Sequence, residues 1–188
     1  VPPERPVRIL EIGAGTGGTT ASVLPQLDSR RVSYWFTDVS PAFLENAGQE
    51  LAAFPFVQYR LFDIERDPAA QDLPTGSFDV VIAANAIHAT RDIAAAIGHA
   101  RALLAPGGVL VLLEGTTREP WVDLTFGLTD GWWRFADRHV RSVYPLLDRD
   151  GWRGLLPQVG FDGVRIVPET ASARGHSQAV ILARAPAH

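Results

Sequence analysis

Five short apolar segments alternate with helix-forming stretches along the sequence, and this alternation narrows the fold to one class. The apolar segments are Val7–Gly13, Val32–Asp38, Val57–Asp63, Phe78–Ala84 and Val109–Glu114. The helix-forming stretches are Gly18–Leu27, Pro41–Phe54 and Arg91–Leu104. Strands that are apolar over nearly their whole length, separated by helices, are typical of a parallel sheet covered on both faces. The sequence therefore predicts a doubly wound, Rossmann-like α/β fold.

The pattern changes after the fifth apolar segment. An aromatic-rich segment, Trp121–Asp137, is followed by a helix near Gly151–Val159 and by two strands near Gly163–Pro168 and Ser177–Arg184. The short connection between the last two strands predicts a hairpin, in which one strand runs antiparallel to the rest of the sheet. We therefore expect a mostly parallel seven-stranded sheet with a C-terminal antiparallel hairpin.

The length and composition suit one globular domain. The chain has 188 residues, of which 46% are hydrophobic, and this is enough for a single full core. Its first residues are rich in proline and it contains no methionine. We therefore expect a linker at residues 1–6, left from a longer protein, and one core domain at residues 7–188.

The charge and the lack of cysteine exclude several classes of function. The formal net charge is -4 and there is no run of Lys or Arg, so the sequence does not indicate binding to nucleic acid or to an anionic membrane. The chain has no cysteine, which excludes disulfides, thiolate zinc sites and a thiol nucleophile. It shows no signal-peptide pattern and no apolar run of membrane-spanning length, so we expect a cytoplasmic protein. The ligand should be small or carried by another protein.

A glycine-rich corner joins the first strand to the first helix. It contains the pattern GxGxxG at Gly13, Gly15 and Gly18. Glycines at this edge of such a sheet allow a tight turn and the close approach of a nucleotide. Asp38 and Asp63 end the next two strands, where the first can accept hydrogen bonds from ribose hydroxyls and the second can meet an adenine amino group. Each residue alone could serve a turn or a solvated strand end, but together they indicate a nucleoside site.

Glu11 helps to choose between two kinds of nucleoside cofactor. A nicotinamide dinucleotide would use the same glycines and the same ribose carboxylate, so the glycine corner alone does not separate a dehydrogenase from a methyltransferase. A carboxylate two residues before the first glycine disfavours a pyrophosphate and favours a ligand with an ammonium or sulfonium group. A nicotinamide-dependent reductase is therefore the less favoured alternative.

With these motifs, the chain resembles the class I S-adenosylmethionine-dependent methyltransferases. The resemblance rests on "LEIGAGTGG", "FTDVS", "FDVVIAANAIHAT" and "LLAPGGVLVLLE". More narrowly, the chain resembles the methyltransferase domains of polyketide synthases, through "HATRD", "DLTFGLTDGWWRFADRHVR" and "PLLDRDGWRGLLPQVGF". The resemblance extends from about Val7 to Arg184. Domains of this family usually carry a helical lid before the nucleotide core, so we expect a lid that was removed or is reduced.

The resemblance implies that the cofactor is S-adenosylmethionine, with S-adenosylhomocysteine as its product, and that no metal ion is needed. The residues expected to hold the cofactor lie at or beside strand ends: Glu11, Gly13, Ala14, Gly15, Asp38, Val39, Asp63, Ile64 and Asn85. Members that methylate carbon resemble this chain in having a catalytic dyad of histidine and glutamate, which matches His88 and Glu114.

The positions of His88 and Glu114 support this assignment. His88 follows the fourth strand and Glu114 ends the fifth, and neighbouring strands lie about 4.8 Å apart, so the side chains can meet. A carboxylate bonded to one imidazole nitrogen fixes the tautomer and makes the other nitrogen a better base. The alternative is a histidine that only caps the next helix, with a glutamate solvated at the sheet edge. The pairing of the two favours the dyad.

The aromatic-rich segment is the candidate for acceptor binding. Trp132 and Trp133 are adjacent and cannot both point into one core from a helix, so one of them is a candidate to line an acyl or pantetheine channel. Phe126 and Phe135 have near-helical spacing, which favours a place in the core.

These observations predict an enzyme that methylates the α-carbon of a β-ketoacyl chain tethered to an acyl carrier protein. The other domains of a polyketide synthase would be its partners. His88 would remove the α-proton, and the resulting enolate would take the methyl group. The same base would serve O-methylation of an enol or hydroxyl, which is the close alternative. A catalytically inactive domain kept as a structural spacer is disfavoured, because a spacer has no physical need of the intact motifs.

Overall fold

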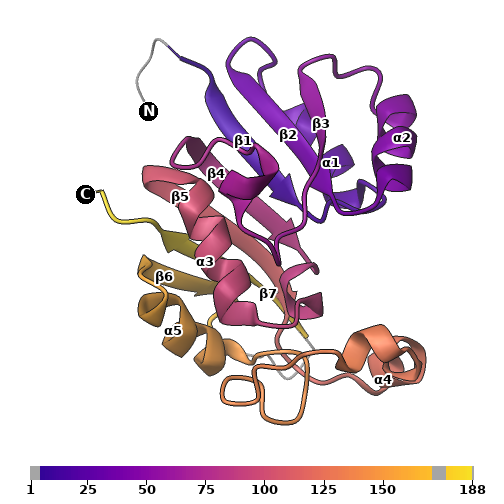
Figure 1. Ribbon diagram of the computed structural model, residues 1–188, viewed down its shortest axis with the longest axis vertical. Helices are drawn as coiled ribbons and strands as arrows, with labels where there is room; N and C mark the ends of the chain where they lie inside the picture. Colours follow the sequence, from indigo (N-terminus) through magenta and orange to yellow (C-terminus); the bar gives the residue numbers. More distant parts are fainter. Residues whose placement is uncertain (1–4, 171–176, 188) are drawn as a thin grey trace.

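The computed structural model describes residues 5–170 and 177–187, which form one seven-stranded sheet flanked by helices (Figure 1). The strands are β1 (Val7–Ile12), β2 (Val32–Asp38), β3 (Val57–Leu61), β4 (Phe78–Ala84), β5 (Leu104–Gly115), β6 (Asp162–Val167) and β7 (Gln178–Arg184). The α-helices are α1 (Gly18–Val23), α2 (Pro41–Glu50), α3 (Ile93–Leu103), α4 (Pro120–Thr125) and α5 (Arg149–Gln158). Short 3-10 helices are η1 (Leu24–Gln26), η2 (Pro68–Gln71), η3 (Ile87–Ala89), η4 (Phe126–Leu128) and η5 (Asp130–Trp133). Within the described ranges, no helix has the length and apolar character needed to cross a membrane.

The sheet has the strand order β3-β2-β1-β4-β5-β7-β6. The pairs from β3 to β5 are all parallel, whereas β7 pairs antiparallel with both β5 and β6. This confirms the predicted α/β fold, with a mostly parallel seven-stranded sheet and a C-terminal antiparallel hairpin. Successive strands are added in opposite directions on either side of β1 and β4. Such a switch point leaves a ligand crevice at the carboxyl ends of these two strands.

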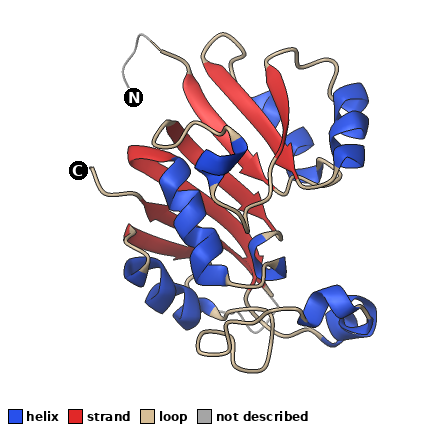
Figure 2. Ribbon diagram, viewed as in Figure 1, coloured by secondary structure: helices blue, strands red, loops and turns tan. Residues whose placement is uncertain are grey.

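Helices cover both faces of the sheet, with α3 in front of it and α1 behind it in Figure 2. Because side chains alternate along a strand, β1 contributes to both apolar layers. Leu10 and Ile12 pack in the layer that contains α3 and α5, whereas Ile9 packs in the layer that contains Ala47 of α2. Glu11 lies on the same side of β1 as Ile9, and this decides where its carboxylate points.

Most ends lie within two residues of the expected ones, but three elements differ by more. The first helix was expected over residues 18–27, but α1 ends at Val23 and continues as η1, because Pro25 has no N–H to donate within an α-helix. Helix α2 ends at Glu50, before the expected end. Strand β5 already begins at Leu104, and its register against β4 shifts near its start. None of these changes moves the carboxyl ends of the strands, where the candidate site residues lie.

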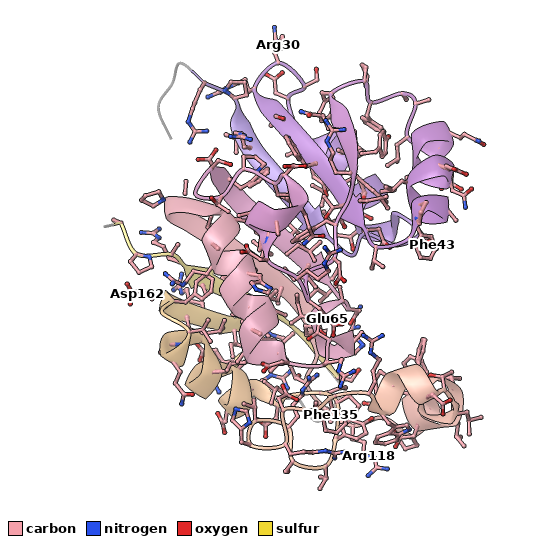
Figure 3. All side chains as sticks on the ribbon, in the orientation of Figure 1. Arg30, Phe43, Glu65, Arg118, Phe135 and Asp162 are labelled. Carbon is pink, nitrogen blue, oxygen red and sulfur yellow. The ribbon has the colours of Figure 1, made fainter. Side chains whose placement is uncertain are left out.

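The aromatic-rich segment forms α4, η4 and η5 at one end of the molecule (Figure 1). Phe135 is 4% exposed, which confirms its predicted place in the core, but Phe126 is 54% exposed, so that prediction is wrong. The cause is that the segment is not one helix: Thr129 is extended, and the near-helical spacing has no helix to act on. Arg134 pairs with Glu65 of the loop after β3 at 2.7 Å, and Figure 3 shows Glu65 and Phe135 at the same end of the sheet.

The expected linker falls mainly on residues 1–4, which lie outside the described residues. Arg5 donates two hydrogen bonds, of 2.6 and 2.8 Å, to Asp79 at the start of β4. Burial alone would raise the pKa of Asp79, but the hydrogen bonds from Arg5 and from the Arg8 N–H outweigh it and lower that pKa. This ion pair fixes the direction in which the chain enters the sheet.

Candidate active site

The glycine corner forms a tight loop at the carboxyl end of β1. Gly13, Gly15 and Gly17 all have left-handed backbone angles, with φ of 60°, 56° and 77°. Residues with a side chain rarely adopt these angles. A Cβ added at Gly15 would meet only the carbonyl oxygen of Gly13, at 4.0 Å. The loop therefore exposes bare backbone that a ligand can approach closely.

Gly13 also brings this loop against the loop that follows β4. A Cβ built at Gly13 would lie 2.8 Å from the Cβ of Ala86, closer than real Cβ atoms come. Ala86 directly precedes η3, the 3-10 helix that carries His88. The glycine corner and the loop that carries His88 are therefore in direct contact, and this is possible only because position 13 has no side chain.

Asp38 ends β2 and holds the backbone around the glycine corner. One carboxylate oxygen accepts the Gly15 N–H and the other accepts the Ser40 N–H, both at 2.9 Å. Asp38 is only 5% exposed. A carboxylate can accept about four hydrogen bonds, so two positions remain for a pair of hydroxyl groups.

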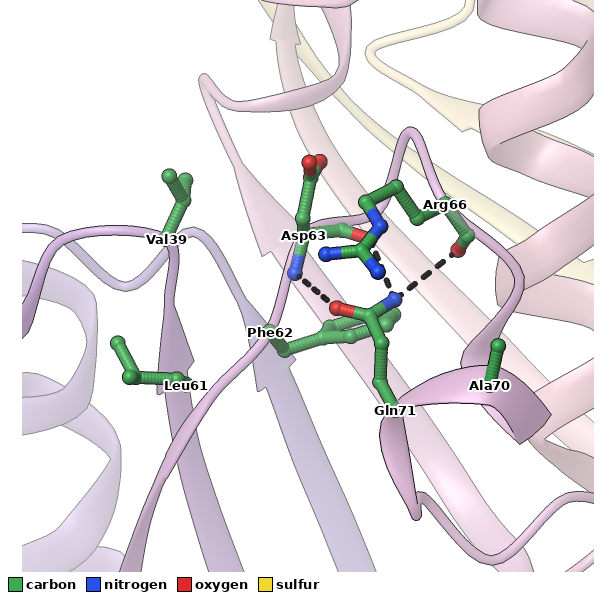
Figure 4. Close-up of a pocket in the computed structure, with 7 residues that line it drawn as sticks. All are labelled: Val39, Leu61, Phe62, Asp63, Arg66, Ala70 and Gln71. Carbon is green, nitrogen blue, oxygen red and sulfur yellow. Dashed lines mark hydrogen bonds between the residues drawn. The ribbon is translucent and has the colours of Figure 1, made fainter.

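A cavity of about 460 Å³ lies beside Asp38, at the ends of β2 and β3 (Figure 4). Its walls come from both strand ends and from η2: Val39, Leu61, Phe62, Asp63, Arg66, Ala70 and Gln71. Gln71 holds the loop after β3 in place, since its Oε1 accepts the Asp63 N–H and its Nε2 donates to the carbonyls of Asp63, Arg66 and Asp67. Figure 4 shows the Asp63 carboxylate pointing away from Gln71, so this carboxylate is not used by the amide.

The other predicted cofactor residues lie around this crevice in different ways. Val39 is 67% exposed at the cavity wall. The Ala14 N–H donates to the Thr37 carbonyl at 3.0 Å, which fixes the glycine loop to β2. Ile64 is buried in the core, and its carbonyl contacts His99 Nδ1 at 2.7 Å. The Ile64 side chain therefore lies in the core, and its carbonyl contacts helix α3.

Glu11 is buried between β1, β2 and α1 and does not lie on the surface of the glycine loop. It is 1% exposed, and its Oε2 accepts hydrogen bonds from Thr20 Oγ1 at 2.5 Å and from the Tyr34 hydroxyl at 2.6 Å. Burial raises the pKa of Glu11, and the two hydrogen bonds only partly oppose this. Burial and the Glu11 charge also raise the pKa of Tyr34. The carboxylate thus supports the strand and the helix on either side of the glycine corner.

The structure brings His88 and Glu114 together. His88 Nδ1 lies 2.7 Å from Glu114 Oε2, and the other carboxylate oxygen accepts the Ile87 N–H at 2.9 Å. Glu114 is completely buried, whereas the His88 side chain is 14% exposed. An ionised carboxylate can only accept, so Nδ1 carries the hydrogen and the lone pair of a neutral His88 is on Nε2. Among the described residues, no group of three or more His, Asp or Glu side chains is arranged to hold a metal ion.

Trp132 is the aromatic residue that contacts His88. The two ring centroids are 5.4 Å apart at an interplanar angle of 64°, and the indole also packs against Phe126 and Tyr144. Its Nε1 is buried and has no hydrogen-bond partner in the described part of the chain. Trp133 is 41% exposed and donates its Nε1–H to the Gly127 carbonyl. Of the two predicted tryptophans, the structure thus places Trp132 next to the dyad.

Asn85 lies between the glycine loop and the last strand. It has a left-handed φ of 51°, which asparagine tolerates better than most residues. Its N–H donates to the Leu113 carbonyl at 2.7 Å, and its Oδ1 accepts a hydrogen bond from Gln178 Nε2 at 3.0 Å. The predicted Asn85 therefore forms the edge of the site together with the first residue of β7.

Sequence reasoning missed four residues that support this site: Thr20, Tyr34, Gln71 and Gln178. Gln178 could have been found, because an antiparallel strand beside β5 must begin where β5 ends. The partners of Glu11 could have been found in part, because the alternation along β1 directs Glu11 to the α1 face. Gln71 carries no such signal, since its amide acts on a loop whose path depends on tertiary packing.

Comparison with known proteins identifies the family. The sequence profile of the family described as "Methyltransferase domain" matches residues 10–110, which is more than half of the chain. The polyketide synthase ThaG of Burkholderia thailandensis is 46% identical over 187 residues, covering 97% of this chain and 3% of that protein. The chain thus spans a few per cent of the length of the curated relatives that it matches.

Solved structures agree with this match. The CurJ carbon methyltransferase superposes with a TM-score of 0.94 at 46% identity, covering 99% of this chain and 50% of that chain. The trans-methyltransferase CalH, solved in complex with S-adenosylhomocysteine, superposes with a TM-score of 0.87 at 38% identity, covering 96% of this chain and 51% of that chain. Together with the fold and the sequence profile, these matches show that the chain belongs to the S-adenosylmethionine-dependent methyltransferases and, among them, to the methyltransferase domains of polyketide synthases.

Proposed function

We propose that this domain methylates the α-carbon of a β-ketoacyl chain tethered to an acyl carrier protein, with His88 as the general base and Glu114 as its partner. The observation that carries the proposal is the hydrogen bond between His88 Nδ1 and the buried Glu114 carboxylate. A methyl group can move to a carbon acid only after that carbon has lost a proton. The pair supplies a base for this proton beside a nucleoside crevice.

The crevice has groups that fit S-adenosylmethionine. Asp38 has hydrogen-bond positions left for the ribose hydroxyls, the open backbone at Gly15 lets the amino acid part approach, and the cavity of about 460 Å³ next to Asp63 can take the adenine. When bound, S-adenosylmethionine supplies an electrophilic methyl group on a sulfonium and leaves as S-adenosylhomocysteine. The buried Glu11 carboxylate lies on the strand that leads into the glycine corner and accepts the Tyr34 hydroxyl, and an acidic residue there disfavours an anionic pyrophosphate in the same place.

The first chemical step is a proton transfer to His88. Its Nε2 accepts the α-proton, and the electron pair of the broken C–H bond becomes the enolate of the β-ketoacyl chain. The imidazolium that forms is stabilised by the Glu114 carboxylate at 2.7 Å. Glu114 also holds the Ile87 N–H, so the ring does not need to move when it becomes charged.

The second step forms the new carbon–carbon bond. The enolate carbon takes the methyl group, and the electron pair of the broken carbon–sulfur bond stays on sulfur. The chain's own contribution is alignment, because the reaction needs the nucleophile in line with the leaving group at near-attack distance. Trp132 covers one side of the imidazole, so the acceptor has to approach His88 from the remaining exposed side.

The proposed partners follow from the acceptor. Homologous stretches occur in polyketide synthases many times longer than this chain, which supports a megasynthase in which a carrier protein presents the acyl thioester. On this view residues 7–188 form the methyltransferase core and residues 1–6 belong to a linker. The cytoplasmic location expected from the sequence stays a prediction.

The test is to incubate the protein with S-adenosylmethionine and a carrier-bound β-ketoacyl chain and to locate the added methyl group by mass spectrometry. The matched control is the same chain with two methyl groups already on the α-carbon, which has no α-proton to lose. We expect one methyl group on the α-carbon of the first substrate and none on the control. Transfer to oxygen, or no transfer by a protein that binds S-adenosylmethionine, would overturn the proposal.

A further inference from the structure

Arg141 and Asp137 form a completely buried ion pair outside the site described above. Arg141 Nε donates to both Asp137 oxygens, at 2.9 and 3.0 Å, and neither side chain is exposed. Asp137 is the last residue of the aromatic-rich segment and Arg141 follows it, and the proposed reaction assigns no role to either residue. A buried ion pair is costly to desolvate and is often no more stable than an apolar pair of similar size. Its presence therefore calls for a reason other than stability.

Both partners reach out of their own segment to the loop that carries His88. The Arg141 guanidinium donates to the carbonyl of His88 at 2.8 Å and to the carbonyl of Thr90 at 2.7 Å. Asp137 Oδ2 accepts the N–H of Ile93 at 2.8 Å, in the first turn of α3. The planar guanidinium can bind Asp137 and the carbonyls of His88 and Thr90 at the same time. A lysine ammonium on a flexible stem does not have this fixed planar geometry.

We infer that Arg141 is a positioning residue for His88, with Asp137 fixing the guanidinium in place. Glu114 holds the loop from the β5 side, through the Ile87 N–H and the His88 ring. Arg141 holds the same loop through other groups, the carbonyls of His88 and Thr90. This inference rests on the proposed role of His88 as the base.

The local structure shows why such a clamp is needed. Between the end of β4 and the start of α3, the backbone forms only the short turn η3. The Thr90 hydroxyl stabilises this turn, because its Oγ1 donates a hydrogen bond to the Ile87 carbonyl. Among the described residues, Arg141 is the side chain that donates hydrogen bonds to the carbonyls of His88 and Thr90. A shift of about 1 Å in a catalytic group can cost about 10²-fold in rate, so the clamp acts on the position of the imidazole.

The test compares two altered proteins with a neighbouring control. Arg141→Lys keeps the positive charge beside Asp137 but loses the planar set of guanidinium N–H donors. We expect kcat for methyl transfer to fall about ten- to a hundredfold. The double variant Asp137→Leu with Arg141→Met replaces the buried ion pair by apolar side chains, which is often neutral for stability. We expect it to melt near the wild-type temperature and still to be slow. The control is Arg138→Lys, at an exposed arginine three residues away that donates to the Ser142 carbonyl.

Two further readouts separate positioning from a structural role. S-adenosylmethionine affinity, measured by calorimetry, should stay the same, and the pH profile of kcat should change only in the Arg141 variants. NMR of ¹⁵N-labelled histidine, assigned with His88→Gln, should show altered His88 ring signals in Arg141→Lys and unaltered ones in Arg138→Lys.

Three outcomes would overturn the inference. These are a folded Arg141→Lys protein with wild-type kcat and pH profile, a rate loss no larger than the loss of folded protein, and unchanged His88 ring signals. The NMR arm needs no acceptor, so it tests the clamp even if the wild-type protein fails to methylate carbon. In that case the proposed function would be wrong, but the NMR signals would still test whether Arg141 positions His88.

Discussion

The carboxylate of Glu114 binds His88 with one oxygen and the backbone next to His88 with the other. The distances are 2.7 Å to the ring Nδ1 and 2.9 Å to the Ile87 nitrogen. One buried group therefore fixes both the tautomer of the imidazole and the loop that carries it. A change at Glu114 should alter the chemistry of His88 without touching the crevice for the nucleoside.

Loss of either member of the dyad should slow methyl transfer about 10²- to 10⁴-fold, the usual contribution of a general base. In Glu114→Gln, the amide can turn an N–H toward Nδ1, which moves the ring hydrogen to Nε2 and removes the base. We expect His88→Ala and Glu114→Gln to keep S-adenosylmethionine affinity, and the double variant to be little worse than His88→Ala, because the two act as one unit. Single-turnover rates and calorimetry measure both quantities.

The control for the dyad is His139→Ala, at an exposed histidine. It should keep the wild-type rate. If His88→Ala also kept it, or lost activity only because the cofactor no longer bound, the base would have to be sought at another residue.

Asp38→Ala should weaken binding of S-adenosylmethionine by roughly tenfold to several hundredfold. A hydrogen bond to a charged group is worth about 1.5–3 kcal/mol, and each 1.4 kcal/mol is about tenfold in affinity. Asp38 also accepts the Gly15 and Ser40 N–H groups, so part of the loss would come from a looser glycine loop. Calorimetry measures this affinity. The control is Asp28→Ala, at an exposed aspartate before β2, and this variant should bind S-adenosylmethionine normally. An unchanged affinity in folded Asp38→Ala would remove this residue from the site.

Gly13→Ala should destabilise the fold by at least about 1 kcal/mol. A left-handed backbone angle costs a residue with a side chain roughly 1–2 kcal/mol, and the new Cβ would also overlap Ala86 at 2.8 Å. Gly18→Ala is the matched control, because it lies in α1 with no atom within 4 Å of an added Cβ. This control should be neutral or stabilising, by about 0.4–1 kcal/mol. The free energies of unfolding are measured by urea denaturation. Equal values for the two variants would contradict the packing of the glycine corner against the loop that contains Ala86.

Glu11 should make the protein less stable as the pH rises. Burial raises the pKa of Glu11 in the folded state, so the folded protein keeps this proton to a higher pH than the unfolded chain does. The stabilising contribution is present below the ordinary carboxyl pKa of about 4.3 and is lost as the pH rises through the raised value. In Glu11→Gln this part of the pH dependence should disappear. Unfolding free energies between acidic and neutral pH, with the exposed Glu50→Gln as control, test the sign; an identical slope in both variants would refute it.

The fold and the meeting of the dyad could be predicted from the sequence for the same reason. Parallel strands place their carboxyl ends along one edge, so residues such as Asp38, His88 and Glu114 are neighbours as soon as the strands are recognised. The comparison with known proteins confirms the family that the motifs indicated. The roles of the individual residues remain proposals.

What could not be predicted depends on contacts between segments that have no regular period. Phe126 is exposed because the backbone becomes extended at Thr129 and no helix continues to Phe135, and the apolar pattern does not predict this break. Arg141 is buried because it meets the carbonyls of His88 and Thr90, about 50 residues earlier in the chain. Such a contact depends on the path of two loops, and a lone arginine in a polar stretch is usually a surface residue.

Strand β7 is the last strand in the chain but lies inside the sheet, between β5 and β6. During synthesis on the ribosome, the edge of β5 that will pair with β7 therefore stays unpaired while roughly 70 more residues are added, which takes several seconds at about 5–20 residues per second. An unpaired apolar edge is prone to join other chains. The Asn85–Gln178 contact can thus form only after β7 has emerged, so the part of the sheet from β3 to β5 can pair before its other side is closed by β7 and β6.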